Sequence, residues 1–251
     1  MRQRLVIGNW KMHGGLEFNR RLLSAIQLGF DETACVEAAV CVPFPYLNQV
    51  QTILSGGALT WGAQNVSPYA KGAYTGEVSV SMLQDFSCRY VLVGHSERRA
   101  IFAESDTWIA EAFSALVDAG LRPVLCLGET ALQHDLGQTE SVVSTQLNAV
   151  IERAGVRALR HAVVAYEPVW AIGSGKAASP EQAQAVHAAI RAKIALCDTG
   201  VAETVQIIYG GSVKRENAAA LFLMPDIDGA LVGGSSLVAD DFLAICNAAN
   251  R

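Results

Sequence analysis

The fold class is decided at residues 90–97, which read YVLVGHSE. Four apolar residues in succession, without alternation, predict a parallel strand that is covered on both faces. Gly94 ends the apolar run, and polar residues follow it at once. The same pattern of a short apolar run and a polar or glycine-rich end recurs along the chain. We predict eight strands, at residues 5–7, 38–42, 59–61, 90–93, 122–126, 162–165, 205–208 and 229–232.

Helical stretches separate these strands. The stretch 180–197 is the best formed, because Ser179 can cap it, Pro180 suits its first position, and apolar residues then recur at helical spacing. We predict helices at residues 16–29, 44–54, 78–85, 105–119, 139–154, 180–197, 214–221 and 239–248.

Eight strand–helix units fit a closed (β/α)8 barrel better than an open sheet. Such a barrel typically takes about 250 residues as one domain, and this chain has 251. An open dinucleotide-binding sheet would carry GxGxxG after its first strand, whereas residues 8–11 read GNWK. No linker or low-complexity segment divides the chain. We therefore expect a single α/β domain over residues 1–251.

The composition excludes several classes of protein. Apolar residues make up 51% and charged residues 17% of the chain, which excludes disorder. The net charge is −5 and no basic stripe is visible, so we expect neither a nucleic-acid partner nor membrane association. Residues 38–70 lack charged side chains and histidine, but prolines, glycines and amides interrupt them too often for a transmembrane helix.

The six cysteines form no CxxC pair and lie mostly in apolar runs. Buried, reduced thiols are the simplest interpretation, and they favour a cytoplasmic location. Zinc would require clustered ligands at tight spacing, so we expect no metal. The basic start MRQR precedes only three apolar residues, fewer than the 7–15 of a signal peptide.

Unusual polar residues fall at the carboxyl ends of the predicted strands, where catalytic groups gather in barrels. They are Asn9 and Lys11 after the first strand, Gln64 and Asn65 after the third, His95 after the fourth, Glu167 after the sixth, Gly210-Gly211-Ser212 after the seventh and Gly233-Gly234-Ser235 after the eighth.

Each of these residues allows a structural and a functional interpretation. Lys11 is either a surface lysine or a cation for a phosphate or a developing oxyanion. His95 is either satisfied by the backbone or an imidazole at a helix N-terminus, where the dipole disfavours its charged form. Glu167 is either in a structural ion pair or a base with a raised pKa. Glu97 is either a helix cap or a polar neighbour of Lys11.

Glycine-rich turns follow the last two strands. Backbone N–H groups in such turns can converge on a phosphate, as in many barrels. Residues 173–176 read GSGK but lack the spacing of a P-loop, and a mobile lid with small residues at one end is the better interpretation.

These residues together resemble the triosephosphate isomerase family. The matching segments lie in family order between residues 8 and 237, and they are GNWKM at 8–12, AQN at 63–65, GAYTGE at 72–77, VGHSERR at 93–99, AYEPVWAIG at 165–173, YGGSV at 209–213 and GALVGG at 229–234.

The resemblance implies a single-domain (β/α)8 TIM barrel that interconverts dihydroxyacetone phosphate and D-glyceraldehyde 3-phosphate in glycolysis and gluconeogenesis. The reaction moves a proton through an enediolate intermediate and needs no cofactor. Glu167 would be the base, and His95 the electrophile that polarises the carbonyl oxygen. Lys11 and Asn9 would contact the substrate. The pairing of a glutamate base with a neutral histidine in this enzyme is a known example of pKa tuning.

The resemblance also assigns the phosphate site, the lid and an interface. Residues 168–178 would form the lid. Residues 72–77, with Thr75 and Glu77, would enter the neighbouring subunit of a homodimer. The phosphate binders would be Gly173, Ser212, Gly233 and Gly234. The lid residues of interest are Pro168, Val169, Trp170, Ala171, Ile172, Gly173, Ser174, Gly175 and Lys176.

Two departures from the family pattern are mild. Ser174 stands where threonine is usual, and residues 133–135, QHD, lack the Arg-Glu pair common in relatives. Two other functional classes remain open. An aldolase of this fold would need a Schiff-base lysine inside a strand, and none is apparent. A catalytically inactive binding dimer would lack Glu167 or His95, and both are present.

Overall fold

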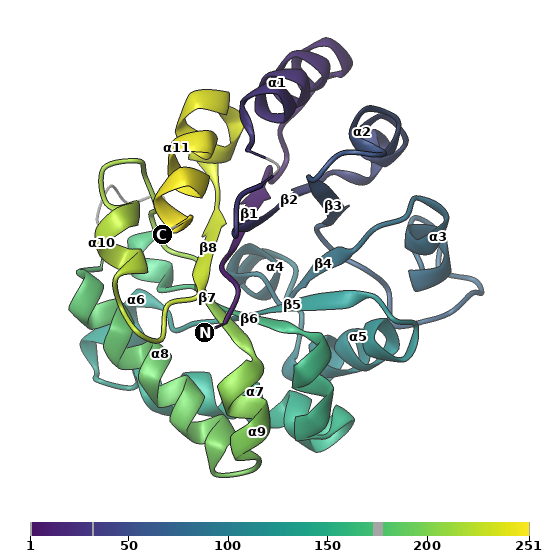
Figure 1. The fold of residues 1–251 in the computed structure, drawn as a ribbon. Coiled ribbons are helices and arrows are strands. Elements are labelled where there is room, and N and C mark those ends of the chain that lie inside the picture. The colour runs from purple at the N-terminus through teal and green to yellow at the C-terminus, as the bar shows by residue number, and fades with distance from the viewer. Residues whose placement is uncertain (1, 32, 173–177, 251) are drawn as a thin grey trace.

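The structure is a computed structural model that describes residues 2–31, 33–172 and 178–250. Its strands form a closed parallel barrel in chain order, and β1 pairs with β8 to complete the ring (Figure 1). The strands are β1 (Leu5–Asn9), β2 (Glu37–Val42), β3 (Thr60–Ala63), β4 (Tyr90–Val93), β5 (Arg122–Leu127), β6 (Val163–Tyr166), β7 (Gln206–Tyr209) and β8 (Gly229–Val232). The predicted single-domain (β/α)8 barrel is confirmed.

Helices surround the barrel (Figure 1). The α-helices are α1 (Leu16–Gly29), α2 (Leu47–Leu54), α3 (Val80–Asp85), α4 (Ser96–Ile101), α5 (Asp106–Asp118), α6 (Ala131–Asp135), α7 (Thr139–Ala154), α8 (Pro180–Ala195), α9 (Thr199–Thr204), α10 (Ala218–Phe222) and α11 (Ala239–Ala249). Short 3-10 helices are η1 (Phe44–Tyr46), η2 (Val156–His161), η3 (Val169–Ala171) and η4 (Gly234–Leu237).

Most predicted elements are present, with shifted ends. The third strand begins one residue later than predicted and continues to Ala63, and Asn9 is the last residue of β1 rather than the residue after it. The helix predicted at 44–54 is divided into η1 and α2. The helix predicted at 214–221 forms only from Ala218, because residues 214–217 form a turn in which the Asn217 side chain accepts the Lys214 N–H.

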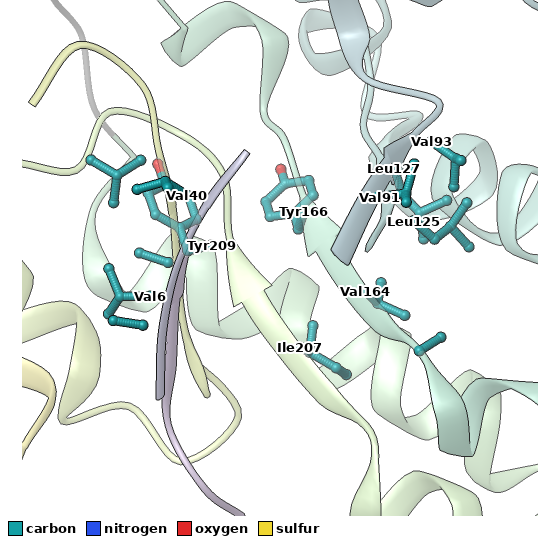
Figure 2. Close-up of a cluster of buried hydrophobic side chains, with 14 of the residues drawn as sticks. Val6, Val40, Val91, Val93, Leu125, Leu127, Val164, Tyr166, Ile207 and Tyr209 are labelled. Atoms are coloured by element: carbon teal, nitrogen blue, oxygen red, sulfur yellow. The ribbon is translucent and has the colours of Figure 1, made fainter. Parts of the chain in front are cut away.

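The strand side chains alternate between two hydrophobic clusters, which explains why the runs themselves do not alternate in polarity. One cluster fills the barrel interior, with Leu5, Ile7, Leu92, Cys126 and Leu231 among its members. The other lies between the strands and the helices. Figure 2 shows part of this outer cluster, including Val6, Val40, Val91, Val93, Leu125, Leu127, Val164, Tyr166, Ile207 and Tyr209.

Burial accounts for two features of the composition. Much of the charge-free stretch 38–70 forms β2, α2 and β3, whose apolar side chains belong to the core. Cys41, Cys88, Cys126 and Cys246 are buried free thiols, as predicted, whereas Cys35 and Cys197 are exposed. No helix in the described part of the chain is long and apolar enough to span a membrane.

Candidate active site

The carboxyl ends of the strands surround a cavity of about 330 Å³. This volume suits a small ligand rather than a large cofactor. The cavity is lined by Asn9, Lys11, His95, Glu167, Ile172, Gly210, Gly211, Ser212, Val213, Lys214, Leu231, Gly233, Gly234 and Ser235. Most polar residues selected from the sequence therefore meet at one site, although they come from distant parts of the chain.

Glu167 follows β6 and is only 2% exposed. Its Oε1 lies 3.0 Å from Nε2 of His95, and its Oε2 accepts the backbone N–H of Ser96 at 2.8 Å. Two glycines provide its space. A Cβ on Gly128 would lie 1.8 Å from the Glu167 carbonyl oxygen, and a Cβ on Gly210 would lie 2.8 Å from its Cγ. A larger residue at position 128 would displace the backbone of Glu167, and one at position 210 would displace its side chain.

The raised pKa predicted for Glu167 is wrong for this arrangement. Burial raises the pKa of the carboxyl, but His95, the Ser96 N–H and the charge of Lys11 together lower it below its ordinary value. The apolar sequence around Glu167 indicated its burial. His95 and Lys11 were selected from the sequence as members of the same site, whereas the contact with the Ser96 N–H was not indicated by the sequence.

His95 caps the N-terminus of α4, and Gly94 before it turns the chain with a φ of 72°. Nδ1 of His95 accepts the backbone N–H of Glu97 at 3.2 Å, so the hydrogen of a neutral ring is on Nε2, which faces Glu167. Burial lowers the pKa of His95, while Glu167 and, more weakly, Glu97 raise it above its ordinary value. Because the Glu97 amide hydrogen already occupies Nδ1, we assign the neutral Nε2–H tautomer.

Lys11 is held in an uncommon backbone conformation, with a φ of 51°. The buried Asn9 side chain supports this turn, because its Oδ1 accepts the Lys11 N–H at 3.0 Å. Nζ of Lys11 lies 2.6 Å from Oε1 of Glu97. Glu97 is therefore a neighbour of Lys11, and Lys11 is a positioned, half-buried cation at the cavity wall rather than a free surface lysine.

The turns after β7 and β8 form the part of the cavity wall that adjoins Glu167 and Lys11. Ser212, Gly233 and Gly234 all line it, as the phosphate interpretation requires. Lys214 also lines the cavity, and the sequence reasoning did not select it. Its position two residues beyond the Gly210-Gly211-Ser212 turn was the available signal.

The predicted lid, residues 168–178, is described at residues 168–172 and at Ala178. η3 follows Pro168, and Ile172 lines the cavity together with Leu231, which lies within β8. Gly173, Ser174, Gly175 and Lys176 lie outside the described residues. Nε1 of Trp170 donates to Oε1 of Glu129 at 2.8 Å. Glu129 is completely buried and was not selected from the sequence.

A second cavity of about 470 Å³ adjoins the first and shares Asn9, Lys11 and His95 with it. Its remaining wall is formed by Met12, Pro43, Phe44, Pro45, Gln64, Asn65, Leu92, Glu97, Arg98, Ile101 and Phe102. Gln64 and Asn65 therefore lie beside the candidate active site rather than in it. Thr75 and Glu77 belong to an exposed stretch and line neither cavity.

Among residues 2–31, 33–172 and 178–250, no group of three His, Cys, Asp or Glu side chains could hold a metal ion.

Fold and site together define a class, the (β/α)8-barrel enzymes that carry a buried carboxylate, an imidazole and a lysine around a small cavity at the carboxyl end of the strands. A family model described as triosephosphate isomerase matches residues 4–249. The chain therefore belongs to the triosephosphate isomerase family and is an isomerase.

Relatives named triosephosphate isomerase match the chain along its length. The protein from Dechloromonas aromatica is 62% identical over 250 residues, which cover 100% of both chains. The protein from Thiobacillus denitrificans is 60% identical over 251 residues, with the same coverage. The protein from Nitrosomonas europaea is 55% identical over 246 residues, or 98% of each chain.

Proposed function

We propose that Glu167, His95, Lys11 and Asn9 perform the reaction of a triosephosphate isomerase in this chain. The chain interconverts dihydroxyacetone phosphate and D-glyceraldehyde 3-phosphate, in glycolysis and gluconeogenesis. The observation that carries the assignment of roles is the contact between the Glu167 carboxylate and Nε2 of His95, which both face a small cavity with Lys11 on its wall. Substrate and product are isomers, so the reaction needs no redox cofactor.

The reaction begins with the removal of a proton from the carbon beside the carbonyl group, and Glu167 is the base. His95 has one hydrogen on Nε2, and in this structure Glu167 receives it. The substrate carbonyl can accept that hydrogen only when the carboxylate leaves. Departure from His95 and from Ser96 removes two interactions that lower the pKa of Glu167, so substrate binding makes the carboxylate a stronger base.

The enediolate that results carries negative charge on the former carbonyl oxygen. The Nε2–H of His95 and the ammonium group of Lys11 stabilise this charge, and Asn9 fixes the position of Lys11. Glu167 returns the proton to the neighbouring carbon, while His95 moves a proton between the two oxygens. The net change is the transfer of hydrogen within one molecule.

The phosphate group of the substrate binds at the turns after β7 and β8. Ser212, Gly233 and Gly234 contact it, and Gly173 completes the site when the lid of residues 168–178 closes. Closure excludes water, which strengthens the electrostatic interactions inside the site. It also protects the enediolate, which can eliminate its phosphate when exposed to solvent.

The protein acts as a cytoplasmic homodimer. Exposed apolar side chains of Met12, Ile101 and Phe102 surround the second cavity, and this supports a subunit interface beside the active site. The loop that carries Thr75 and Glu77 projects as an exposed stretch and is the segment that enters the partner. The interface would then bury the surface around Lys11 and His95.

A coupled assay of glyceraldehyde 3-phosphate turnover tests the proposal. We expect isomerase activity in the unmodified protein and a loss of about a thousandfold or more in Glu167→Gln, because a general base contributes about 10²–10⁴ in rate. The variant should retain its circular dichroism spectrum and bind a phosphorylated inhibitor. Glu152→Gln, which removes an exposed carboxylate on α7, is the matched control and should be fully active. Activity near the unmodified level in Glu167→Gln would refute the role of the base.

A further inference from the structure

Lys214 lies at the mouth of the candidate active site. It lines the cavity of about 330 Å³ and is also exposed to solvent, so it belongs to the rim of the site rather than to its floor. Lys11 and Lys214 are the two lysines in the described part of the cavity wall. The reaction steps proposed above give a task to Lys11 and none to Lys214.

The two lysines differ in their electrostatic surroundings. Nζ of Lys11 lies 2.6 Å from Oε1 of Glu97, so a carboxylate already balances its charge. Lys214 has no ion-pair partner among the described residues. His95 is neutral in the assigned tautomer, and the carboxylates of Glu167 and Glu97 outweigh the single charge of Lys11. Within the described residues, Lys214 is therefore the uncompensated cation that an anionic ligand meets at this cavity.

The backbone of Lys214 is fixed by the side chain of Asn217. Oδ1 of Asn217 accepts the Lys214 N–H at 2.8 Å, and Nδ2 donates to the Ser212 carbonyl at 3.0 Å. The Lys214 carbonyl accepts the N–H of Asn217 at 3.2 Å and that of Ala218, the first residue of α10, at 3.0 Å. One amide side chain thus closes the turn and fixes the point at which the Lys214 side chain leaves the backbone.

This turn is also joined to the turn after β8. The hydroxyl of Ser235 donates to the Val213 carbonyl at 3.2 Å, which holds the two glycine-rich turns together. Lys214 is two residues from Ser212, so their Cα atoms lie within about 7 Å of each other. An anion held by the Ser212 turn and by Gly234 is therefore within reach of the long, flexible side chain of Lys214.

We propose that Lys214 binds the phosphate group of the substrate and forms a salt bridge with it at the mouth of the cavity. The inference rests on the proposed function, in which the turns after β7 and β8 hold the phosphate. Backbone N–H groups fix the position of an anion but carry only partial charges, whereas an ammonium group supplies a full positive charge. Lys214 also attracts the anion before contact, against the net charge of −5 of the chain.

Removal of the charge should weaken the binding of substrate and transition state alike, because the phosphate does not change during the reaction. Lys214→Gln should therefore raise KM for glyceraldehyde 3-phosphate about threefold to tenfold and leave kcat nearly unchanged. This range lies between the effect of an exposed ion pair and that of a buried charge-assisted hydrogen bond. Lys214→Arg keeps the charge and should restore KM to within about twofold. An unchanged KM in Lys214→Gln would overturn the proposal.

Arg215→Gln is the matched control, because it removes the same charge from the next residue. Arg215 is exposed, lines neither cavity and lies 3.6 Å from Asp241, so its replacement should leave KM unchanged. An equal rise of KM in both variants would show an effect of net charge alone and contradict the salt bridge. The ratio of KM in Lys214→Gln to that of the unmodified protein should also approach one between about 0.01 M and about 1 M salt, since the Debye length falls from about 30 Å to about 3 Å. A ratio that does not depend on salt would show that Lys214 acts through its shape and not its charge.

A second readout does not depend on activity. Isothermal titration calorimetry with inorganic phosphate at pH 8, where the anion is dianionic, measures the binding of the anion itself. The Kd should rise about threefold to tenfold in Lys214→Gln and stay constant in Arg215→Gln. An equal Kd in Lys214→Gln and the unmodified protein, or no binding to the unmodified protein, would overturn the proposal. An unmodified protein that binds phosphate but lacks isomerase activity would instead overturn the proposed function, while the phosphate titration would still test Lys214.

Discussion

Glu167 and His95 hold each other in the arrangement that precedes substrate binding. Each is buried, and each offers the other the hydrogen-bond partner that a buried polar group requires. The pair therefore stays satisfied while the cavity is empty. The substrate carbonyl replaces Glu167 as the acceptor for His95, so binding and the release of the base are one event.

The protonation state of His95 is testable directly. We expect a neutral Nε2–H ring at pH 7 and above, because the Glu97 N–H is directed at Nδ1 and leaves no acceptor for a second proton. Nitrogen NMR of histidine-labelled protein measures this, with His95→Gln to assign the signal among five histidines. An imidazolium signal from His95 at neutral pH would show that the Glu167 charge prevails over the Glu97 amide.

His187 predicts an acid sensitivity of the fold. The side chain is completely buried between α8 and the core, and burial, with a smaller effect from Arg191, lowers its pKa to about 4. Between about pH 6.5 and 4, the unfolded chain therefore binds a proton at His187 that the folded chain does not bind. Stability must fall as the pH falls through this range, by about 3 kcal/mol from His187 alone. Urea unfolding at fixed protein concentration, at pH 7 and pH 4.5, measures the difference.

His187→Gln is the comparison for that experiment. It removes the titrating ring, so the loss of stability between the two pH values should shrink. Asp226 has a pKa lowered by Gln184 and Arg191 against the effect of burial, and it contributes acid sensitivity of the same sign at lower pH. An equal loss of stability in both proteins would show that His187 is not its source.

Among the helices, length affects what the sequence could predict, although the short helices α3 and α10 overlap the predicted helices 78–85 and 214–221. α8 has 16 residues, and Ser179 and Gln182 form its capping box, so both the helix and its first residue could be predicted from the sequence. α6 and α9 have five and six residues and were missed, because so short a helix shows less than two turns of any periodic pattern. α4 has six residues and was expected only through His95, which was interpreted as lying at a helix N-terminus. The polar ends of the strands were predictable since they follow apolar runs. The contacts between these polar residues could not be predicted, because they depend on the closure of the barrel, which brings together loops that are distant in the sequence.

Two of these short helices matter for the site. α4 presents the N–H groups of Ser96 and Glu97 to Glu167 and His95, and α6 brings His134 to Trp170. Both helices begin shortly after a strand, in a segment whose composition is typical of a turn. A capping pattern such as Thr130 followed by Gln133 was the available signal for α6.

The lid predicts two separable effects. Deletion of residues 171–174 should reduce isomerisation by orders of magnitude, because the closed, water-free environment is lost. The fraction of turnovers that release methylglyoxal and inorganic phosphate should rise, since the enediolate is then open to solvent. Assays of both products on the deletion variant measure this.

Folding of the deletion variant is checked by circular dichroism, which should change little because the deletion removes no residue of the described barrel strands or α-helices. A reduced rate with an unchanged product ratio would mean that the lid controls only the entry of substrate. A normal rate would mean that residues 171–174 have no part in closure.

On the scale of the whole molecule, the two ends of the barrel have different tasks. At the amino end of the strands, Asp228 accepts hydrogen bonds from Arg2 and Arg191 and from the Ile207 N–H, which ties the start of β8 to α8 and β7. At the carboxyl end, the loops surround the cavity. Stability and chemistry are therefore separated along the barrel axis, as is typical of this fold.

The exposed apolar side chains of Met12, Ile101 and Phe102 lie on the catalytic side of this division, and they predict the assembly. The stretch 69–77 projects into solvent with Tyr69 and Tyr74 stacked at 4.2 Å, and the second cavity offers an apolar wall next to His95. We expect a mass near twice 26.7 kDa by light scattering at micromolar concentration. Thr75→Glu should weaken dimerisation by about a hundredfold or more, because an unpaired charge in an interface costs about 3 kcal/mol or more.

Activity per chain should fall together with dimerisation, since the partner's loop is expected to complete the surroundings of Lys11 and His95. Thr204→Glu places the same charge on an exposed threonine at the end of α9, before β7, and should leave both mass and activity unchanged. The two variants carry equal net charge, so a difference between them locates the interface at the catalytic end of the barrel. A monomer that retains full activity at micromolar concentration would show that one chain contains the complete site.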